Sequence, residues 1–256
     1  MHCTTLSHAQ QKLIAALQVK KYRQKYRKFV VEGEKMVAEL LTQTQLPVSA
    51  IFGLERWATD HAALLEPFLE KFNPVSEADL KKISALTTPN QVLALADLPS
   101  APPYPELLYT RPCFYLDGLQ DPGNLGAILR IADWFGWPAV FCSPDCVDAF
   151  SPKVVQASMG AIFRIQTHET DLATLVAEAP DLPVLGAVLG GNDVFSTSWP
   201  AHGLLVIGNE GRGISPATAG LLTQRLTIPR HPAGRAESLN AAVAAGILAA
   251  LWQPRL

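Results

Sequence analysis

The stretch that decides the fold lies late in the chain: LLVIGNEGRGIS (204–215), followed by LTIPRHPAGRAESLNAAVAAGILAALW (226–252). The apolar run at 204–207 is typical of a buried strand, and the glycines after it let backbone approach a ligand closely. A second short strand stops at Pro229, and a polar loop then leads to an alanine-rich helix that Ser238 or Asn240 can cap. Open α/β sheets bind ligands in loops that follow strand ends, so this stretch predicts a site.

Alternating strands and helices precede this stretch. We expect strands at 113–116, 139–142, 161–165 and 184–189, helices at 127–135, 151–159 and 170–178, and a turn-rich loop at 117–126. This alternation predicts the α/β fold class. A mostly parallel sheet would carry helices on both faces and bind its ligand at the carboxyl edge.

The first 98 residues show a shorter alternation of the same kind. We expect strands at 29–31, 50–53 and 92–96, and helices at 7–19, 34–41, 59–72 and after Ser76. LPSAPPYPE (98–106) then carries four prolines in nine residues, a composition typical of a linker. The sequence therefore predicts a small α/β domain at 1–98, a Pro-rich linker at 99–111 and a larger domain at 112–256.

Composition excludes several classes of protein. Hydrophobic residues make up 48% and charged residues 17% of the chain, which indicates a folded protein and not a disordered one. A net charge of −2 argues against a uniformly basic nucleic-acid coat. The four cysteines form no CxxC pair, so we expect reduced thiols and no metal site. The first residues lack the pattern of a secretory signal, and no apolar run reaches about 18 residues, so we expect a cytoplasmic protein.

A basic segment, KKYRQKYRK (20–28), stands out in this slightly acidic chain. Its cationic residues are Lys20, Lys21, Arg23, Lys25, Arg27 and Lys28. One interpretation is a solvated helix end. The other is an RNA-binding patch, in which the cations contact phosphates and the interleaved Tyr22 and Tyr26 offer stacking platforms. The sequence leaves both interpretations open.

Polar side chains gather after three predicted strands. The sequence contains no GxGxxG after a first strand, no GxxxxGK[ST] and no GxSxG, so dinucleotide, P-loop and serine-hydrolase chemistries lose their main support. The three polar clusters are Asn124 and Arg130; Asn209, Glu210 and Arg212; and Arg235, Ser238 and Asn240. Singly, each has an ordinary explanation as a surface arginine, a turn residue or a helix cap. Together they indicate a ligand site.

Three segments resemble, in order, the three motifs of the SpoU (TrmH-like) family of RNA ribose 2′-O-methyltransferases, which belongs to the SPOUT superfamily. They are DGLQDPGNLGAILRIADWFG (117–136), LLVIGNEGRGIS and IPRHPAGRAESLNAAVAAGI (228–247). FVVEGEKMVAELL (29–41) and LTTPNQVLALA (86–96) resemble that family's N-terminal substrate-binding domain, which has a ribosomal-protein-like α/β fold. The resemblance implies a trefoil knot in the C-terminal domain, S-adenosylmethionine as cofactor, an RNA substrate with ribosomal RNA favoured over transfer RNA, and a homodimer.

The resemblance also implies which residues act. The catalytic positions would be Asn124, Arg130, Glu210, Ser238 and Asn240, and the cofactor would contact Leu189, Gly208, Ile228 and Leu239. Gly208, Ile228 and Leu239 would act largely through backbone groups. We expect Arg130 to anchor substrate and stabilise developing alkoxide, because a guanidinium is a poor base. We expect Glu210 to orient Arg130 or an arginine of a partner subunit.

One loop departs from the family pattern, and other functions stay open. RHPAGRAE (230–237) is longer than the family's loop, so His231 and Arg235 are either substrate contacts or residues of an insertion. The alternatives are a transfer-RNA ribose methyltransferase, a methyltransferase that acts on a base or a small molecule, and a non-catalytic RNA-binding or ribosome-assembly factor. The retained polar residues argue against the last, and the basic segment argues for a large RNA substrate.

Overall fold

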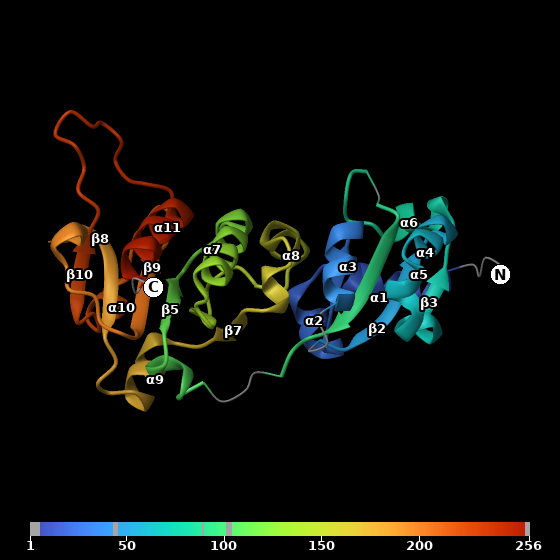
Figure 1. Ribbon diagram of the computed structural model, residues 1–256, viewed down its shortest axis with the longest axis horizontal. Coiled ribbons are helices and arrows are strands. Elements are labelled where there is room, and N and C mark those ends of the chain that lie inside the picture. The colour runs from blue at the N-terminus through green and yellow to red at the C-terminus, as the bar shows by residue number, and fades with distance from the viewer. Residues whose placement is uncertain (1–5, 43–45, 89, 101–103, 254–256) are drawn as a thin grey trace. The chain divides into compact units, whose positions relative to one another are not determined.

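The computed structural model describes residues 6–42, 46–88, 90–100 and 104–253. The chain forms two compact units (Figure 1). Unit 1 consists of Met1–Ser100 and Phe150–Phe163, and unit 2 consists of Ala101–Ala149 and Arg164–Leu256. Residues 101–103 of the predicted linker lie outside the described residues. The segment at 150–163, which the sequence places in the larger domain, groups with unit 1.

Unit 2 is built on a six-stranded sheet. Its strands are β5 (Pro112–Asp117), β6 (Ala139–Cys142), β7 (Gln166–Glu169), β8 (Val184–Asp193), β9 (Gly203–Gly208) and β10 (Gln224–Thr227). The strand order is β10-β8-β9-β5-β6-β7, and every neighbouring pair is parallel. All six residues of β5 are buried, as in a central strand with both faces covered. The predicted α/β class with a parallel sheet is confirmed.

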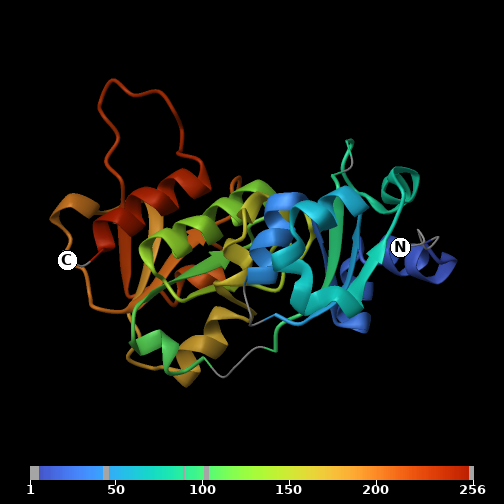
Figure 2. The ribbon, with the colours of Figure 1, turned by 45° about the vertical axis from the view of Figure 1, so that its right-hand side comes forward.

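Helices cover both faces of this sheet (Figure 2). On one face, Phe114 of β5 lies 4.4 Å from Trp137 between ring centroids, and Trp137 contacts Trp252 at the end of α11 (Ala241–Trp252). On the other face, Tyr115 packs in one core with Leu172 of α9 (Leu172–Glu178). The remaining helices of unit 2 are η2 (Leu107–Tyr109), α7 (Pro122–Phe135), η4 (Val194–Ser196) and α10 (Pro216–Ala219).

Unit 1 contains a four-stranded sheet of order β1-β4-β2-β3. Its strands are β1 (Lys28–Glu32), β2 (Val48–Gly53), β3 (Phe72–Pro74) and β4 (Val92–Asp97); β4 runs antiparallel to β1 and β2, while β3 is parallel to β2. Its helices are α1 (His8–Ala16), α2 (Lys20–Tyr26), α3 (Glu34–Thr42), α4 (Glu55–Asp60), α5 (Ala62–Leu65), η1 (Glu66–Lys71), α6 (Glu77–Ile83), α8 (Pro152–Ser158) and η3 (Ala161–Phe163). No helix in the described part of the chain is long and apolar enough to cross a bilayer.

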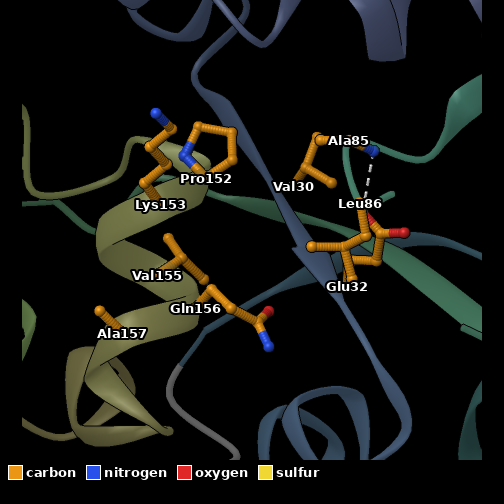
Figure 3. A pocket seen from close by; sticks show the side chains of 9 residues that line it. All are labelled: Val30, Glu32, Ala85, Leu86, Pro152, Lys153, Val155, Gln156 and Ala157. Atoms are coloured by element: carbon orange, nitrogen blue, oxygen red, sulfur yellow. Dashed lines mark hydrogen bonds between the residues drawn. The ribbon is translucent and has the colours of Figure 1, made fainter. Parts of the chain in front are cut away.

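The segment that contains α8 and η3 completes unit 1. Phe150 lies 5.0 Å from Phe29 between ring centroids, and α8 packs against the edge strand β1. A mainly apolar cavity of about 300 Å³ lies between α8, β1 and the turn at 84–86 (Figure 3). The Glu32 carboxylate lines this cavity and accepts a hydrogen bond from the Ala85 N–H at 3.1 Å. A helix against an edge strand protects it from pairing with another chain.

Local structure differs from the sequence-based expectation in three places. The strand expected at 161–165 is wrong, because η3 occupies Ala161–Phe163 and β7 begins at Gln166. The first turn of α7 was expected to be loop. Instead α7 begins at Pro122, because the Asp121 carboxylate accepts the Asn124 N–H at 2.7 Å and caps it. The helix expected at 59–72 is broken into α4, α5 and η1, and a strand that was not expected, β3, follows at Phe72–Pro74.

Candidate functional site

The candidate site lies at the carboxyl edge of the unit 2 sheet. β5 and β9 are neighbours, and Asp117 at the end of β5 is in register with Gly208 at the end of β9. The loop after β5 leads into α7, and the loop after β9 carries Glu210. Parallel strands therefore bring the first two polar clusters together at one edge, where such sheets bind ligands.

Glu210 joins the loop after β9 to the turn before α7. Its carboxylate accepts hydrogen bonds from the Gln120 N–H at 3.4 Å, the Asp121 N–H at 3.2 Å and the Asn124 Nδ2 at 3.0 Å. Partial burial raises the pKa of Glu210, but the hydrogen bonds from Asn124 and the backbone outweigh it, so the pKa lies below its ordinary value. Glu210 is thus held as a carboxylate.

Asn124 connects this carboxylate to the third cluster. Its Nδ2 donates to Glu210, and its Oδ1 accepts from the Asn240 Nδ2 at 2.9 Å. Asn240 also caps α11, because its Oδ1 accepts the backbone N–H groups of Ala242 and Val243 at 2.9 and 3.2 Å. Of the two caps expected from the sequence, Asn240 is the one observed. Three residues far apart in sequence form one hydrogen-bonded group, the Asn124–Glu210–Asn240 group.

Arg130 stands apart from this group. It is exposed on α7, and no hydrogen bond or ion pair links it to any residue in the described ranges. The expectation that Glu210 orients Arg130 within one chain is therefore corrected, because the Glu210 carboxylate bonds to Asn124 and to backbone amides instead. Ser238 is exposed in the loop before α11.

Of the residues expected at the cofactor, Gly208 ends β9 and Ile228 follows β10, whereas β8 continues past Leu189 to Asp193 and Leu239 lies just before α11. A Cβ on Gly208 would lie 2.3 Å from the Gly213 carbonyl carbon, so only glycine fits where the loop folds back on β9. Ile228 is half-buried directly after β10. Leu189 on β8 is 80% exposed and Leu239 before α11 is 48% exposed. Close backbone and exposed apolar side chains suit a ligand such as S-adenosylmethionine, which has an aromatic base and many hydrogen-bonding groups.

The sequence places Asn209 in a polar cluster without indicating its role, and it does not single out Asp117, yet both residues fix these loops. The Asn209 Nδ2 donates to the Gly118 carbonyl at 2.7 Å, while its Oδ1 accepts the Gly211 and Arg212 N–H groups at 3.0 Å. The buried Asp117 accepts the Ser215 N–H at 2.6 Å. The tendency of Asn and Asp to bond nearby backbone was the available signal. Within the described ranges, no group of three or more His, Cys, Asp or Glu could hold a metal.

The basic segment of unit 1 is only partly available to a ligand. Arg23 is buried, and its Nη1 donates to the Leu17 carbonyl at 2.7 Å, so the expectation that it contacts RNA is corrected. Lys28 forms an ion pair with Asp97, and the Arg27 Nη2 donates to the Pro99 carbonyl at 3.0 Å. These cations help to fold unit 1.

The outer face of α2 keeps the features of a binding surface. Tyr22 and Tyr26 are exposed and stacked, with ring centroids 6.3 Å apart and planes 19° apart. Lys21 and Lys25 are exposed, and Lys20 is half-buried. The Lys25 ammonium lies 5.4 Å from the Tyr26 ring centroid. We call these five residues the α2 face.

Comparison with known proteins decides the family. Residues 112–250 match the SpoU rRNA Methylase family, and residues 9–94 match the MRM3-like substrate binding domain. The chain belongs to the SpoU rRNA methylase family. This SpoU-family chain is 31% identical over 236 residues to the 23S rRNA (guanosine(2553)-2′-O)-methyltransferase RlmP of Bacillus subtilis, covering 91% of each chain.

Solved structures of family members resemble it along nearly the whole chain. A TrmH-family protein from Porphyromonas gingivalis superposes with a TM-score of 0.85 at 39% identity, covering 98% of this chain and 99% of the other. An S-adenosylmethionine-bound rRNA methyltransferase from Sinorhizobium meliloti superposes with a TM-score of 0.82 at 26% identity, covering 97% of each.

Proposed function

We propose that this SpoU-family protein transfers a methyl group from S-adenosylmethionine to a ribose 2′-hydroxyl of ribosomal RNA. The observation that carries the proposal is the Asn124–Glu210–Asn240 group, in which all three family motifs meet at the carboxyl edge of the parallel sheet. The activity named for the RlmP relative and the cofactor bound in the S. meliloti structure support it. Transfer RNA is the alternative substrate, and a cytoplasmic location is part of the proposal.

The chain's own residues suit the cofactor and the transfer. Backbone at Gly208 and Ile228, with the side chains of Leu189 and Leu239, would hold the cofactor. When bound, S-adenosylmethionine supplies a methyl group on a positively charged sulfur. Asn124 and Asn240 keep the loops that surround it in one geometry, because each bonds to a different element. Such positioning is what an in-line displacement needs.

Arg130 is proposed to act on the ribose. A guanidinium is a poor base, so Arg130 is not assigned the role of accepting the proton of the 2′-hydroxyl. It stabilises negative charge as it develops on the ribose oxygen and on a neighbouring phosphate, while the proton leaves to solvent or to the RNA phosphate. Its exposure and lack of a partner among the described residues leave it available for this contact. Ser238, exposed beside Leu239, completes the set of proposed catalytic residues.

Binding and turnover measured on the same variants test this assignment. We expect Leu239→Arg to abolish calorimetric binding of S-adenosylmethionine. Arg130→Ala should bind it almost as tightly as the unsubstituted protein, yet lose methylation of 23S rRNA mapped by primer extension. Arg225→Ala, an exposed arginine on β10, is the matched control and should keep both.

Two results would count against the proposal. Loss of cofactor binding in Arg130→Ala would remove its role as a substrate anchor. An unsubstituted protein that binds no S-adenosylmethionine, even with RNA present, would favour the non-catalytic RNA-binding alternative.

The domain at 1–98 is proposed to dock the RNA through the α2 face. Stacked, exposed tyrosines offer surfaces to unpaired bases, and the neighbouring lysines offer contacts to phosphates. We expect Lys21→Glu and Lys25→Glu to weaken RNA binding and each to lower the salt slope by about 1. Lys81→Glu on α6 carries the same charge change and should bind like the unsubstituted protein. Equal weakening in all three variants would indicate a general charge effect.

A homodimer is proposed to cover one face of unit 2, and a trefoil knot is part of the same proposal. α11 contains no charged side chain, yet its apolar Val243 is 51% exposed, and Trp134 on α7 is 84% exposed. The two helices pack together, and the exposed apolar side chains that they carry favour a covering partner. A second copy fits best, because Trp134 lies one turn from Arg130 and would bring that arginine to the subunit boundary.

Sedimentation tests the dimer. Trp134→Glu and Val243→Glu should each convert a dimer to a monomer. Leu69→Glu, a substitution of an exposed leucine in unit 1, should leave the dimer intact. A monomeric unsubstituted protein at micromolar concentration would refute the proposal.

A further inference from the structure

Two cysteines lie beside the turn that carries the candidate site. Cys146 is half-buried, and its sulfur accepts the Leu119 N–H at 3.2 Å. Its thiol donates to the Leu116 carbonyl at 3.2 Å and lies 3.4 Å from the Ser143 Oγ. Leu116 and Leu119 flank the junction between β5 and the turn before α7. The sulfur of Cys146 therefore holds this turn through two backbone contacts.

Cys142 ends β6 directly beside this position. In the sheet it is paired with Leu116, the same residue whose carbonyl accepts the Cys146 thiol. The chain then turns back, because the Cys146 N–H donates to the Ser143 carbonyl at 2.9 Å. Both sulfurs are thus placed at the same end of β5 and β6, and a C-x3-C spacing within a turn can close a small ring.

The surroundings give the two thiols different chemistry. A hydrogen bond with Cys142 lowers the pKa of Cys146 to about 7; burial opposes the shift, and bonds from Ser143 and Leu119 support it. The pKa of the buried Cys142 is raised, first by its hydrogen bond with Cys146 and then by burial. The thiolate form of a cysteine is the nucleophile. Cys146 has the lower pKa and is the more exposed of the two, so its sulfur is the one that reacts first.

We propose that Cys146 and Cys142 are an oxidation site at which hydroperoxides close a disulfide. The Cys146 thiolate attacks one peroxide oxygen, the O–O bond breaks, and a sulfenic acid forms; the leaving hydroxide or alkoxide takes up the proton that the thiol released on ionising and departs as water or alcohol. The Cys142 sulfur then attacks the Cys146 sulfur and displaces hydroxide, which takes the Cys142 proton and leaves as water. Two thiols lose two electrons in total, and one peroxide gains them. Disulfides of this kind in reduced compartments are usually transient and regulatory.

Closure of the disulfide would act on the site through the turn. The Cys146 thiol proton that bonds to the Leu116 carbonyl is lost, and the sulfur is drawn from the Leu119 N–H towards Cys142. Leu119 precedes Gln120 and Asp121, whose N–H groups bind the Glu210 carboxylate. The oxidised protein should therefore lose methyl transfer. This last step rests on the proposed function, whereas the disulfide itself does not.

Counting thiols tests the pair without any assay of activity. The full-length protein with Cys3→Ser leaves three cysteines, of which Cys113 is buried and has a pKa raised by burial to about 12. After hydrogen peroxide treatment and denaturation, we expect maleimide labelling to fall from three thiols to one, with recovery on addition of dithiothreitol. Peptide mass spectrometry should identify a Cys142–Cys146 link, and Cys142→Ala should prevent it.

Other outcomes separate the claims. Unchanged labelling, or a Cys146 sulfinic acid with no link to Cys142, would overturn the proposal. A disulfide that leaves methylation of 23S rRNA intact would overturn its effect on the site. A protein that forms the disulfide under peroxide, yet does not methylate RNA when it is reduced, would contradict the proposed function and leave the proposed oxidation site intact.

Discussion

At the scale of single residues, Glu210 holds the candidate site together. One carboxylate receives two backbone N–H groups and the Asn124 amide, and so it joins the loop after β9 to the start of α7. A glutamine at this position has one oxygen and one NH₂ group, and the NH₂ group cannot accept a hydrogen bond from an N–H donor. Some of the hydrogen bonds to Glu210 would therefore be lost. The charge of Glu210 thus has a structural use that does not depend on any ligand.

Acid should remove the stabilisation that the Glu210 carboxylate gives to these loops. Its pKa is lower in the folded protein than the ordinary value of 4.5, so its carboxylate stabilises the fold above that pH and loses the effect as pH falls through the folded value. We expect Glu210→Gln to lower the urea midpoint at pH 7 and to differ little from the unsubstituted protein well below pH 4.5. A constant difference across this range would contradict the prediction.

Asn209 should be nearly as important as Glu210 for the same loop. Asn209→Asp keeps an acceptor for Gly211 and Arg212 but replaces the Nδ2 donor with an oxygen facing the Gly118 carbonyl. We expect a loss of about 1–3 kcal/mol in the free energy of unfolding, measured with urea. Asn192→Asp, an exposed position on β8, is the matched control and should change it by less than about 0.5 kcal/mol.

At the scale of elements, two helix starts that look alike in sequence differ in structure. α7 and α8 both follow a capping residue and begin with proline. The Asp121 side chain bonds to the Asn124 N–H, whereas the Ser151 hydroxyl is buried without a hydrogen-bond partner. Asp121→Ala should therefore cost about 1 kcal/mol and Ser151→Ala close to nothing. If both variants lost the same free energy of unfolding in denaturant, side-chain capping would not be the difference between the two helix starts.

Sequence patterns located most elements, and the exceptions have physical causes. Apolar runs marked β5, β6 and β9, because buried parallel strands need them. The same signal failed at 161–165, since a short apolar run can also be a buried helical turn, here η3. DPGN (121–124), at the start of α7, has the composition of a turn, yet a capping Asp followed by Pro is also how a helix starts.

The candidate site was predictable as a region and not as a set of contacts. Polar clusters after strand ends indicated the carboxyl edge, but the bonds among Asn124, Glu210 and Asn240 depend on strand order, which no spacing reveals. For Arg23 the sequence predicted a contact that the structure does not allow. Its position among lysines suggested that it is exposed, whereas its side chain is buried and its guanidinium donates to a backbone carbonyl.

At the scale of the whole molecule, the chain passes between its units more than once. Residues 150–163 leave unit 2, complete unit 1 and return. Removing residues 1–100 would therefore uncover side chains of this segment, among them Phe150, which contacts Phe29, and Val155, which lines the cavity beside Val30. We expect a chain that starts at residue 101 to aggregate or to bind an apolar dye in gel filtration. A monodisperse, dye-free peak would contradict this expectation. Substitutions on the α2 face are thus a cleaner test of RNA docking than truncation.

The same return of the chain sets an order for synthesis. When residue 100 leaves the ribosome, β1 still lacks α8 and Phe29 still lacks Phe150. Translation must add residues 101–163 before those partners exist, which takes about 3–13 s at about 5–20 residues per second. During that interval the edge strand β1 of the nascent amino-terminal half is uncovered. The carboxyl-terminal half begins to emerge before α8 can cover that strand. The two halves of this protein mature together, and neither can finish as an independent early product.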